Sequence, residues 1–179
     1  MLHEKDTALL VIDVQDKLFG QMRDQKELLH NLPRMIQGAQ ALGLPIVWAE
    51  QYPQGMGKTI PEISKLLADQ EPIAKKTFSL CARAPLKEAI EATACKKFLL
   101  VGIETHVCVY QTSLDLLAMG KEVEVVIDCV SSRTKHNRKL GLRRIEQAGG
   151  RLTSLEMVLF ELMHSAEHAC FKDILALVK

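Results

Sequence analysis

Largely apolar runs alternate along the chain with amphipathic segments. Four of these runs cover residues 7–12, 45–50, 97–102 and 122–127. They do not show the apolar-polar alternation of a half-exposed strand, and strands that helices cover on both faces have this composition. We therefore predict a buried strand at each run, with shorter strands at 72–75 and 152–154.

The segments between these runs carry apolar residues at helical spacing. The clearest case is 27–42, where Leu28, Leu32, Met35 and Ile36 fall on one face and Gly43 follows the last turn. The same spacing and helix-ending glycines predict the other helices. These cover residues 61–67, 86–94, 105–119, 135–148, 156–163 and 168–177.

Regular alternation of strands and helices with short connections predicts an α/β three-layer sandwich. Its centre would be a six-stranded parallel sheet with helices on both faces. No repeat, low-complexity tract or Pro/Gly/Ser-rich linker interrupts the pattern, so we expect a single domain over residues 1–179. In such sheets, functional residues gather at the carboxyl ends of the strands.

Three residues suited to chemistry leave the predicted sheet at that edge: Asp13, Lys75 and Cys108. Cys108 falls in the first turn of a helix, where free N–H groups and the helix dipole favour a thiolate and could hold an oxyanion. An ammonium such as Lys75 would lower the thiol pKa further. A carboxylate such as Asp13 could accept the thiol proton and pass it to a leaving group.

Each of these residues also has an ordinary structural interpretation. Asp13 could cap a turn, Lys75 and its neighbour Lys76 could be solvated loop charges, and Cys108 could fill the core. Only the meeting of all three at one sheet edge favours catalysis. The other cysteines are interpreted as structural, and His106 as a helix-start residue that points to solvent.

Composition narrows the classes of partner and location. The net charge is +1, which favours neither nucleic acid nor an anionic membrane as a partner. The five cysteines are odd in number and include no C-x-x-C pair, which favours a reducing compartment, and we expect a cytoplasmic protein. Glu50 alone does not make a metal site, so we predict no metal and no cofactor.

Three motifs resemble the isochorismatase-like cysteine hydrolase superfamily, which includes nicotinamidase and carbamoylsarcosine amidase. They are LLVIDVQDKLF at 9–19, KKTFS at 75–79 and LLVGIETHVCV at 99–109. Residues 50–63 and 125–133 resemble the subgroup of isochorismatase domain-containing proteins. The resemblance implies a Rossmann-like sheet and an Asp-Lys-Cys triad. In this chain the triad would be Asp13, Lys75 and Cys108, with Lys76 as the alternative lysine.

The same resemblance implies further site residues. A non-proline cis peptide bond would join Ile103 and Glu104, and the N–H groups of Glu104 and Cys108 would face the oxyanion. Gln15 would orient Asp13 or touch substrate. The substrate pocket could be lined by aromatic residues, for which we name Phe19, Trp48, Phe78 and Tyr110.

Departures from the family pattern refine the expected reaction. Nicotinamidases have an Asp-x-His metal site, which this chain lacks, so nicotinamide is not favoured as substrate. The presence of Cys108 favours hydrolysis of a small amide-type C–N bond through a thioester-type intermediate. Two alternatives stay open: a catalytically silent regulator that binds a metabolite or partner, and vinyl-ether hydrolysis of the isochorismatase type. Relatives of this kind commonly form homo-oligomers.

Overall fold

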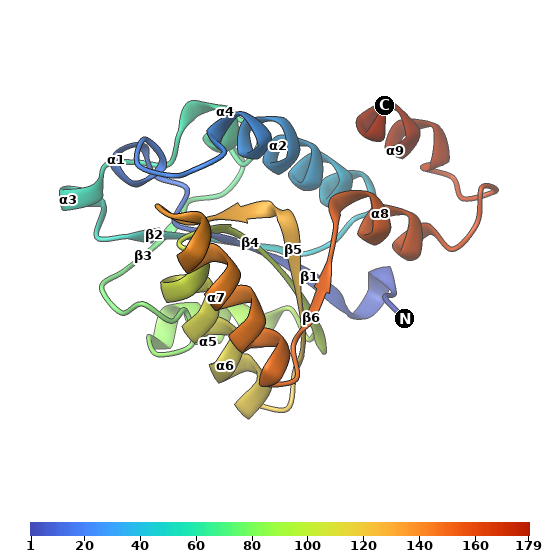
Figure 1. The fold of residues 1–179 in the computed structure, drawn as a ribbon. Coiled ribbons are helices and arrows are strands. Elements are labelled where there is room, and N and C mark those ends of the chain that lie inside the picture. Colours follow the sequence, from blue (N-terminus) through green and yellow to red (C-terminus); the bar gives the residue numbers. More distant parts are fainter.

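A six-stranded parallel sheet lies between two layers of helices in the computed structural model, which describes residues 1–179 (Figure 1). The strand order is β3-β2-β1-β4-β5-β6, and every neighbouring pair is parallel. The predicted fold class is confirmed. The strands are β1 Thr7–Ile12, β2 Ile46–Gln51, β3 Ile73–Lys75, β4 Lys97–Ile103, β5 Glu122–Ser131 and β6 Arg151–Thr153.

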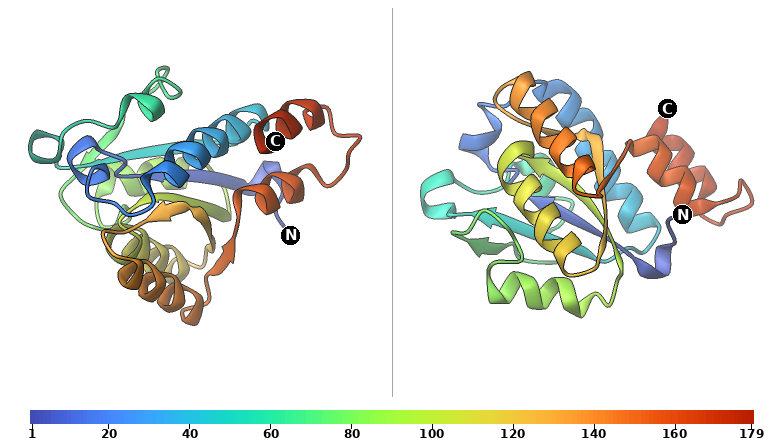
Figure 2. Two further views of the ribbon diagram at one scale, coloured as in Figure 1. Left: turned by 45° about the horizontal axis from the view of Figure 1, so that its top comes forward. Right: turned by 60° about the horizontal axis from the view of Figure 1, so that its bottom comes forward.

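The helices divide between the two faces of the sheet. In Figures 1 and 2, α2, α8 and α9 cover one face, and α5, α6 and α7 cover the other. Two separate hydrophobic clusters, one under each layer, fill the space between helices and strands. The long helices are α2 Gln25–Ala41, α5 Ala84–Ala92, α6 Tyr110–Ala118, α7 Lys135–Gln147, α8 Leu155–Met163 and α9 Phe171–Val178.

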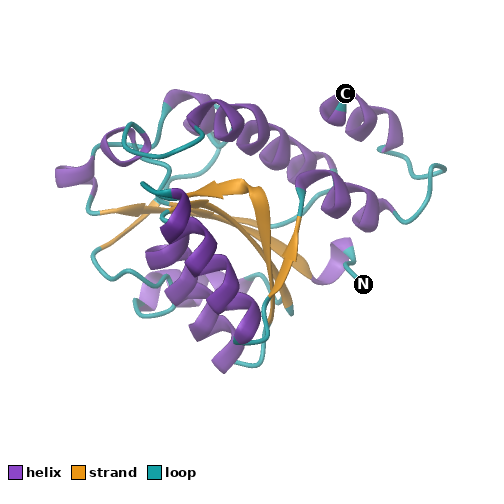
Figure 3. Ribbon diagram, in the orientation of Figure 1, coloured by secondary structure: helices purple, strands orange, loops and turns teal.

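Several short elements were not predicted. Single-turn helices occur at η1 Glu4–Asp6, α1 Asp16–Phe19 and α3 Pro53–Met56. A further short helix, α4 Pro61–Ser64, lies within the helix predicted at 61–67 and is shorter than predicted. One turn is too short to produce a hydrophobic period, so these elements leave no clear trace in the sequence. Figure 3 shows them as helical turns within the loops.

Two predicted elements differ in detail. The predicted helix at 105–119 begins with one π-helical segment, η2 Thr105–Val109, before α6. Strand β5 extends to Ser131 rather than ending at 127, and its pairing with β4 shifts register between Leu100 and Gly102. Because of this shift, the end of β5 lies beside the end of β4, where Ser131 pairs with Ile103.

The sheet changes its winding direction between the adjacent strands β1 and β4. Ile12 pairs with Gly102, so Asp13 and the residues after Ile103 leave the sheet side by side. Gly102 has φ +117°, and a Cβ there would lie 2.1 Å from the Ile12 carbonyl oxygen. Only glycine therefore allows the two strands to approach this closely at the switch point, where ligands bind in open α/β sheets.

None of the helices combines the length and the apolar composition that crossing a membrane requires.

Candidate active site

A buried ion pair joins the ends of β1 and β3. The Nζ atom of Lys75 lies 2.7 Å from Oδ2 of Asp13, and both side chains are completely buried. Nζ also donates to Oε1 of Gln51 at 2.7 Å and to the carbonyl of Thr77 at 3.2 Å. All three ammonium donors are therefore used, which is what a buried lysine requires.

The structure distinguishes the two adjacent lysines. Successive residues of a strand point to opposite faces, so Lys75 and its neighbour cannot both reach Asp13. Lys76 is exposed, and its Nζ lies 5.5 Å from the centroid of the Tyr52 ring. Lys75 is therefore the lysine that meets the carboxylate.

Asp13 sits at a sharp bend directly after β1. Its φ is +55°, and its N–H donates to the carbonyl of Ala49 at 3.1 Å. No N–H or O–H group donates to its Oδ1 atom, which is buried. Burial raises the pKa of the Asp13 carboxyl above its ordinary value, and the ammonium of Lys75 opposes this rise. A raised pKa makes a carboxylate a stronger base.

Cys108 lies in η2, close enough to Asp13 for the two groups to interact. Its side chain is nearly buried, with 6% of the residue exposed. Burial raises the pKa of the Cys108 thiol, and the negative charge of Asp13 and a hydrogen bond to that carboxylate raise it further. Lys75 acts in the opposite direction but does not offset these effects.

The expectation of a resting thiolate is therefore wrong. The helix start and the ammonium were expected to lower the thiol pKa, but burial dominates because a desolvated thiolate is costly. Cys108 rests as a thiol beside a carboxylate that can take its proton.

Burial raises thiol pKa values elsewhere, and this gives a testable effect on stability. Cys129 is completely buried, and burial raises its pKa well above 9.0, the ordinary value of a thiol. Above that pH the unfolded chain loses the thiol proton while the folded chain keeps it, so the free energy of unfolding falls as pH rises. One such thiol contributes a slope of about 1.4 kcal/mol per pH unit.

We expect Cys129→Ala to show a shallower decline than the wild type above about pH 9 and a parallel curve below pH 8. Urea denaturation across this range measures the slope. Identical slopes for the two proteins would show that Cys129 ionises equally easily in the folded state.

Glu104 follows β4 and provides a free backbone donor near Cys108. The peptide bond between Ile103 and Glu104 is cis. The carbonyl of Glu104 accepts from the N–H groups of Val107 and Val109, at 3.0 and 3.3 Å, while its own N–H makes no hydrogen bond. A free N–H at this place suits the oxyanion position that the sequence suggested.

The side chain of Glu104 belongs to a charged cluster that the sequence reasoning missed. Its Oε1 lies 2.7 Å from Nε of Arg133, and its Oε2 lies 3.3 Å from Nδ1 of His106. Nδ1 of His106 is also 3.0 Å from the hydroxyl of Ser132. His106 therefore turns into the protein rather than to solvent, contrary to expectation. The cluster depends on the pairing of Ser131 with Ile103 in the sheet, which the sequence does not reveal.

Gln15 has a different role from the one expected. Its amide nitrogen donates to the carbonyls of Gln51 and Gly57, at 2.9 and 2.6 Å, and its Oε1 accepts from the N–H of Gln51 at 2.6 Å. These three backbone contacts leave Gln15 no free group for substrate or for Asp13. It fixes the end of β2, and Gln51 then holds Lys75.

The four aromatic residues proposed to line a pocket do not share one. Phe19 is 7% exposed and Trp48 is 6% exposed, and both lie in the cluster on the α2 side of the sheet. Phe78 is 52% exposed in the loop after Lys75. Tyr110 packs under the guanidinium of Arg144, which lies 5.5 Å from the ring centroid. Apolar periodicity alone cannot separate core aromatics from lining ones.

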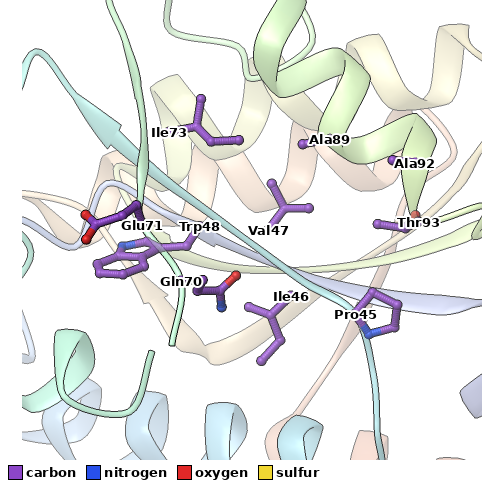
Figure 4. Close-up of a pocket in the computed structure, with 10 residues that line it drawn as sticks. All are labelled: Pro45, Ile46, Val47, Trp48, Gln70, Glu71, Ile73, Ala89, Ala92 and Thr93. Carbon is purple, nitrogen blue, oxygen red and sulfur yellow. The ribbon is translucent and has the colours of Figure 1, made fainter. Parts of the chain in front are cut away.

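A surface hollow of about 460 Å³ lies at the edge of β2, away from the Asp13–Lys75 pair. Figure 4 shows Trp48, Val47 and Ile46 of β2 beside it, with Ala89 of α5 across the strand. None of the ten lining residues is Asp13, Lys75 or Cys108. The charged groups at the strand ends define the candidate site, since an apolar hollow without them has no means of bond cleavage.

All five cysteines are free, and no three His, Cys, Asp or Glu side chains come together as a metal-binding group.

The sheet order and the polar groups at its switch point define an open α/β protein with a site at the ends of β1, β3 and β4. A family model described as the isochorismatase domain matches residues 7–157, and the chain belongs to this family.

Similar proteins extend over nearly the whole chain. The secreted isochorismatase effector Isc1 of Phytophthora sojae is 39% identical, over 97% of this chain and 84% of its own length. Isochorismatase domain-containing protein 2 of Bos taurus is 37% identical, over 97% of this chain and 83% of its own length. These matches support the family resemblance read from the three motifs.

Solved structures show the same fold. A protein described as the MAR1 ribonuclease of Caenorhabditis elegans superposes with a TM-score of 0.93 at 36% identity, covering 99% of this chain and 91% of the other. YcaC of Pseudomonas aeruginosa, solved with hexane-2,5-diol and covalent acrylamide, gives 0.92 at 26% identity, covering 98% and 90%. The YcaC gene product of Escherichia coli, described as an octameric hydrolase of unknown specificity, gives 0.90 at 25% identity, covering 99% and 86%. Family and neighbours together support a hydrolase.

Proposed function

We propose that this protein hydrolyses the C–N bond of a small amide, with Cys108 as nucleophile, Asp13 as general base and acid, and Lys75 as the cation that holds Asp13. The observation that carries the proposal is the fully buried Asp13–Lys75 pair, 2.7 Å apart, beside the thiol of Cys108. A buried ion pair is costly in a protein interior and adds little net stability. The buried pair is explained if Asp13 acts as the base for the Cys108 thiol.

In the first half of the reaction, the Cys108 thiol gives its proton to Asp13 while the sulfur attacks the amide carbonyl carbon. The oxygen of the tetrahedral intermediate takes the negative charge and accepts from the N–H groups of Glu104 and Cys108. Asp13 then gives the proton to the departing nitrogen, and the C–N bond breaks. The products of this half are the amine and a thioester on Cys108.

In the second half, water attacks the thioester and Asp13 accepts one of its protons. The sulfur leaves as the carboxylic acid forms, and it recovers the proton from Asp13. Each of the three donors of Lys75 already has an acceptor, so Lys75 has no part in these proton transfers. The fixed ammonium keeps Asp13 oriented through both proton transfers.

The raised thiol pKa is consistent with this sequence. The thiol keeps its proton until an electrophile reaches the sulfur, and Asp13 accepts the proton as the sulfur attacks. Covalent acrylamide in the Pseudomonas neighbour is a further reason to expect an electrophile-accepting group in this fold.

A screen of small primary amides and ureido compounds tests the proposal. We expect ammonia release by the wild type and none by Cys108→Ala. Cleavage of an enol-ether substrate that survives in Cys108→Ala would instead indicate vinyl-ether hydrolysis. Binding without turnover would indicate a regulator. Cleavage of RNA, which the description of the Caenorhabditis neighbour as a ribonuclease suggests for that protein, would overturn the amide assignment.

We propose a homo-oligomer as well, since the E. coli neighbour is octameric. A cytoplasmic location stays a prediction, and the Phytophthora relative is described as secreted. A near-neutral net charge of +1 gives no reason to propose nucleic acid as a partner.

A further inference from the structure

An arginine is paired with Glu104 at the sheet edge that carries the proposed nucleophile, and much of its side chain is free. Arg133 follows β5, and its Nε lies 2.7 Å from the carboxylate of Glu104. The Glu104 side chain is 8% exposed, whereas that of Arg133 is 55% exposed. The carboxylate thus anchors one edge of the guanidinium from inside the protein, and the rest of the side chain reaches solvent.

Geometry places this pair at the same sheet edge as Cys108. Glu104 lies within one helical turn of Cys108, and its carbonyl accepts from the residues on either side of that cysteine. On the neighbouring strand, Ser131 pairs with Ile103, which brings Arg133 to the end of β4. The negative charge of Glu104 contributes to the raised pKa of the Cys108 thiol.

The terminal amino groups of Arg133 make no hydrogen bond within the chain. Glu104 takes the Nε side of the guanidinium, which leaves the two Nη groups. That pair of donors matches the two oxygens of a carboxylate in a bidentate arrangement. Arg138, five residues further on, differs because its guanidinium donates to the carbonyls of Val130 and Ile127.

Other charges at this edge are already occupied. The ammonium of Lys75 is bound to Asp13. Burial lowers the pKa of His106, the Glu104 carboxylate opposes this effect, and the nearby Arg133 lowers the pKa further. The Oε2 atom of Glu104 is buried and lies 3.3 Å from Nδ1 of His106 without forming a hydrogen bond, and Oε1 is held by Arg133 at 2.7 Å.

We propose that Arg133, held by Glu104, binds a carboxylate of the substrate, so that the hydrolysed compound is a small amide that also carries an anionic group. This inference rests on the proposed function and narrows its substrate class. Glu104 is a positioning residue, since it acts by fixing the guanidinium. Arg133 is a specificity residue, because an uncharged substrate offers its Nη groups nothing to pair with.

A matched pair of substrates tests the inference: succinamate, which carries a carboxylate, and butanamide, which has the same chain length without it. In Arg133→Gln, we expect KM for succinamate to rise about 10-fold or more, because a charge-assisted hydrogen-bonded pair is lost. We expect KM for butanamide to rise much less, because this substrate has no carboxylate for Arg133 to bind. Arg133→Lys should restore part of the affinity.

The control variant is Arg23→Gln. Arg23 is exposed at the same edge, where its N–H donates to the carbonyl of Ser132. Equal losses of succinamate affinity in Arg23→Gln and Arg133→Gln would indicate a general electrostatic effect of positive charge and overturn the inference. Equal losses of affinity for succinamate and butanamide in Arg133→Gln would also overturn it. Because Arg133→Gln leaves Glu104 unpaired, the double variant with Glu104→Gln is measured as well, and circular dichroism checks its folding.

Failure of the inference can be told apart from failure of the proposed function. Saturation-transfer NMR on Cys108→Ala reports binding of succinamate and butanamide without turnover. Preference for succinamate that disappears with Arg133→Gln supports the inference even if the wild type hydrolyses neither compound. Hydrolysis of butanamide and succinamate with equal KM supports the function and overturns the inference.

Discussion

Cys108→Ala should remove amide hydrolysis, with a loss in kcat on the order of 10⁴-fold or more. In the proposed mechanism only the Cys108 sulfur forms the covalent intermediate. The variant therefore cannot carry out the first step of the reaction. The side chain is small and nearly buried, and the replacement removes only the sulfur. Ammonia release under saturating amide measures the effect.

Cys170→Ala is the matched control. Cys170 precedes α9, on the opposite side of the molecule from the strand ends (Figure 1), and its thiol donates to the carbonyl of Ala41. We expect this variant to keep wild-type kcat within about twofold, since it lies outside the site. Activity retained in Cys108→Ala would exclude a thioester and leave Asp13 as the only remaining catalyst.

Lys75→Met should destabilise the protein by about 3–5 kcal/mol. Removing one partner of a buried pair leaves an uncompensated charge, here the Asp13 carboxylate with no exposure to water. The free energy of unfolding from urea titration measures the loss. Protonation of Asp13 removes the uncompensated charge, so the loss of stability should shrink as pH falls. A protonated Asp13 can no longer accept the thiol proton.

Two variants make this result specific. Lys76→Met removes the adjacent, exposed lysine, and we expect a change within about 0.5 kcal/mol. The double variant Asp13→Asn/Lys75→Met removes both charges and should be more stable than Lys75→Met alone. Additive losses in the double variant would contradict a coupled buried pair.

The fold was predictable because its signals are local and repeated. Runs such as 97–102 are apolar enough to be covered on both faces, and Gly43 and Gly120 follow helix ends with positive φ. Alternation of these elements leaves few topologies. The extension of β5 and the π-helical turn at 105–109 escaped prediction, since both arise from pairing and packing between distant segments.

The candidate site was predictable in identity but not in its electrostatics. Strand-end position predicted that Asp13, Lys75 and Cys108 would lie together. The structure pairs Lys75 with Asp13 at 2.7 Å, and the triad stays a proposal. The direction of the thiol pKa shift depends on how deeply the sulfur is buried and on how near the Asp13 carboxylate lies to it. Neither is visible in sequence. The Glu104–Arg133 pair likewise depends on register between β4 and β5.

Alkylation by acrylamide most directly tests whether Cys108 is a nucleophile that Asp13 activates. The protein is treated with limiting acrylamide at neutral pH, and the modified cysteine is identified by peptide mass spectrometry. We predict that Cys108 is modified before the half-buried Cys81 and Cys170, and that Asp13→Asn slows this modification by at least about 10-fold. Modification of Cys81 or Cys170 first, or an unchanged rate in Asp13→Asn, would contradict the account.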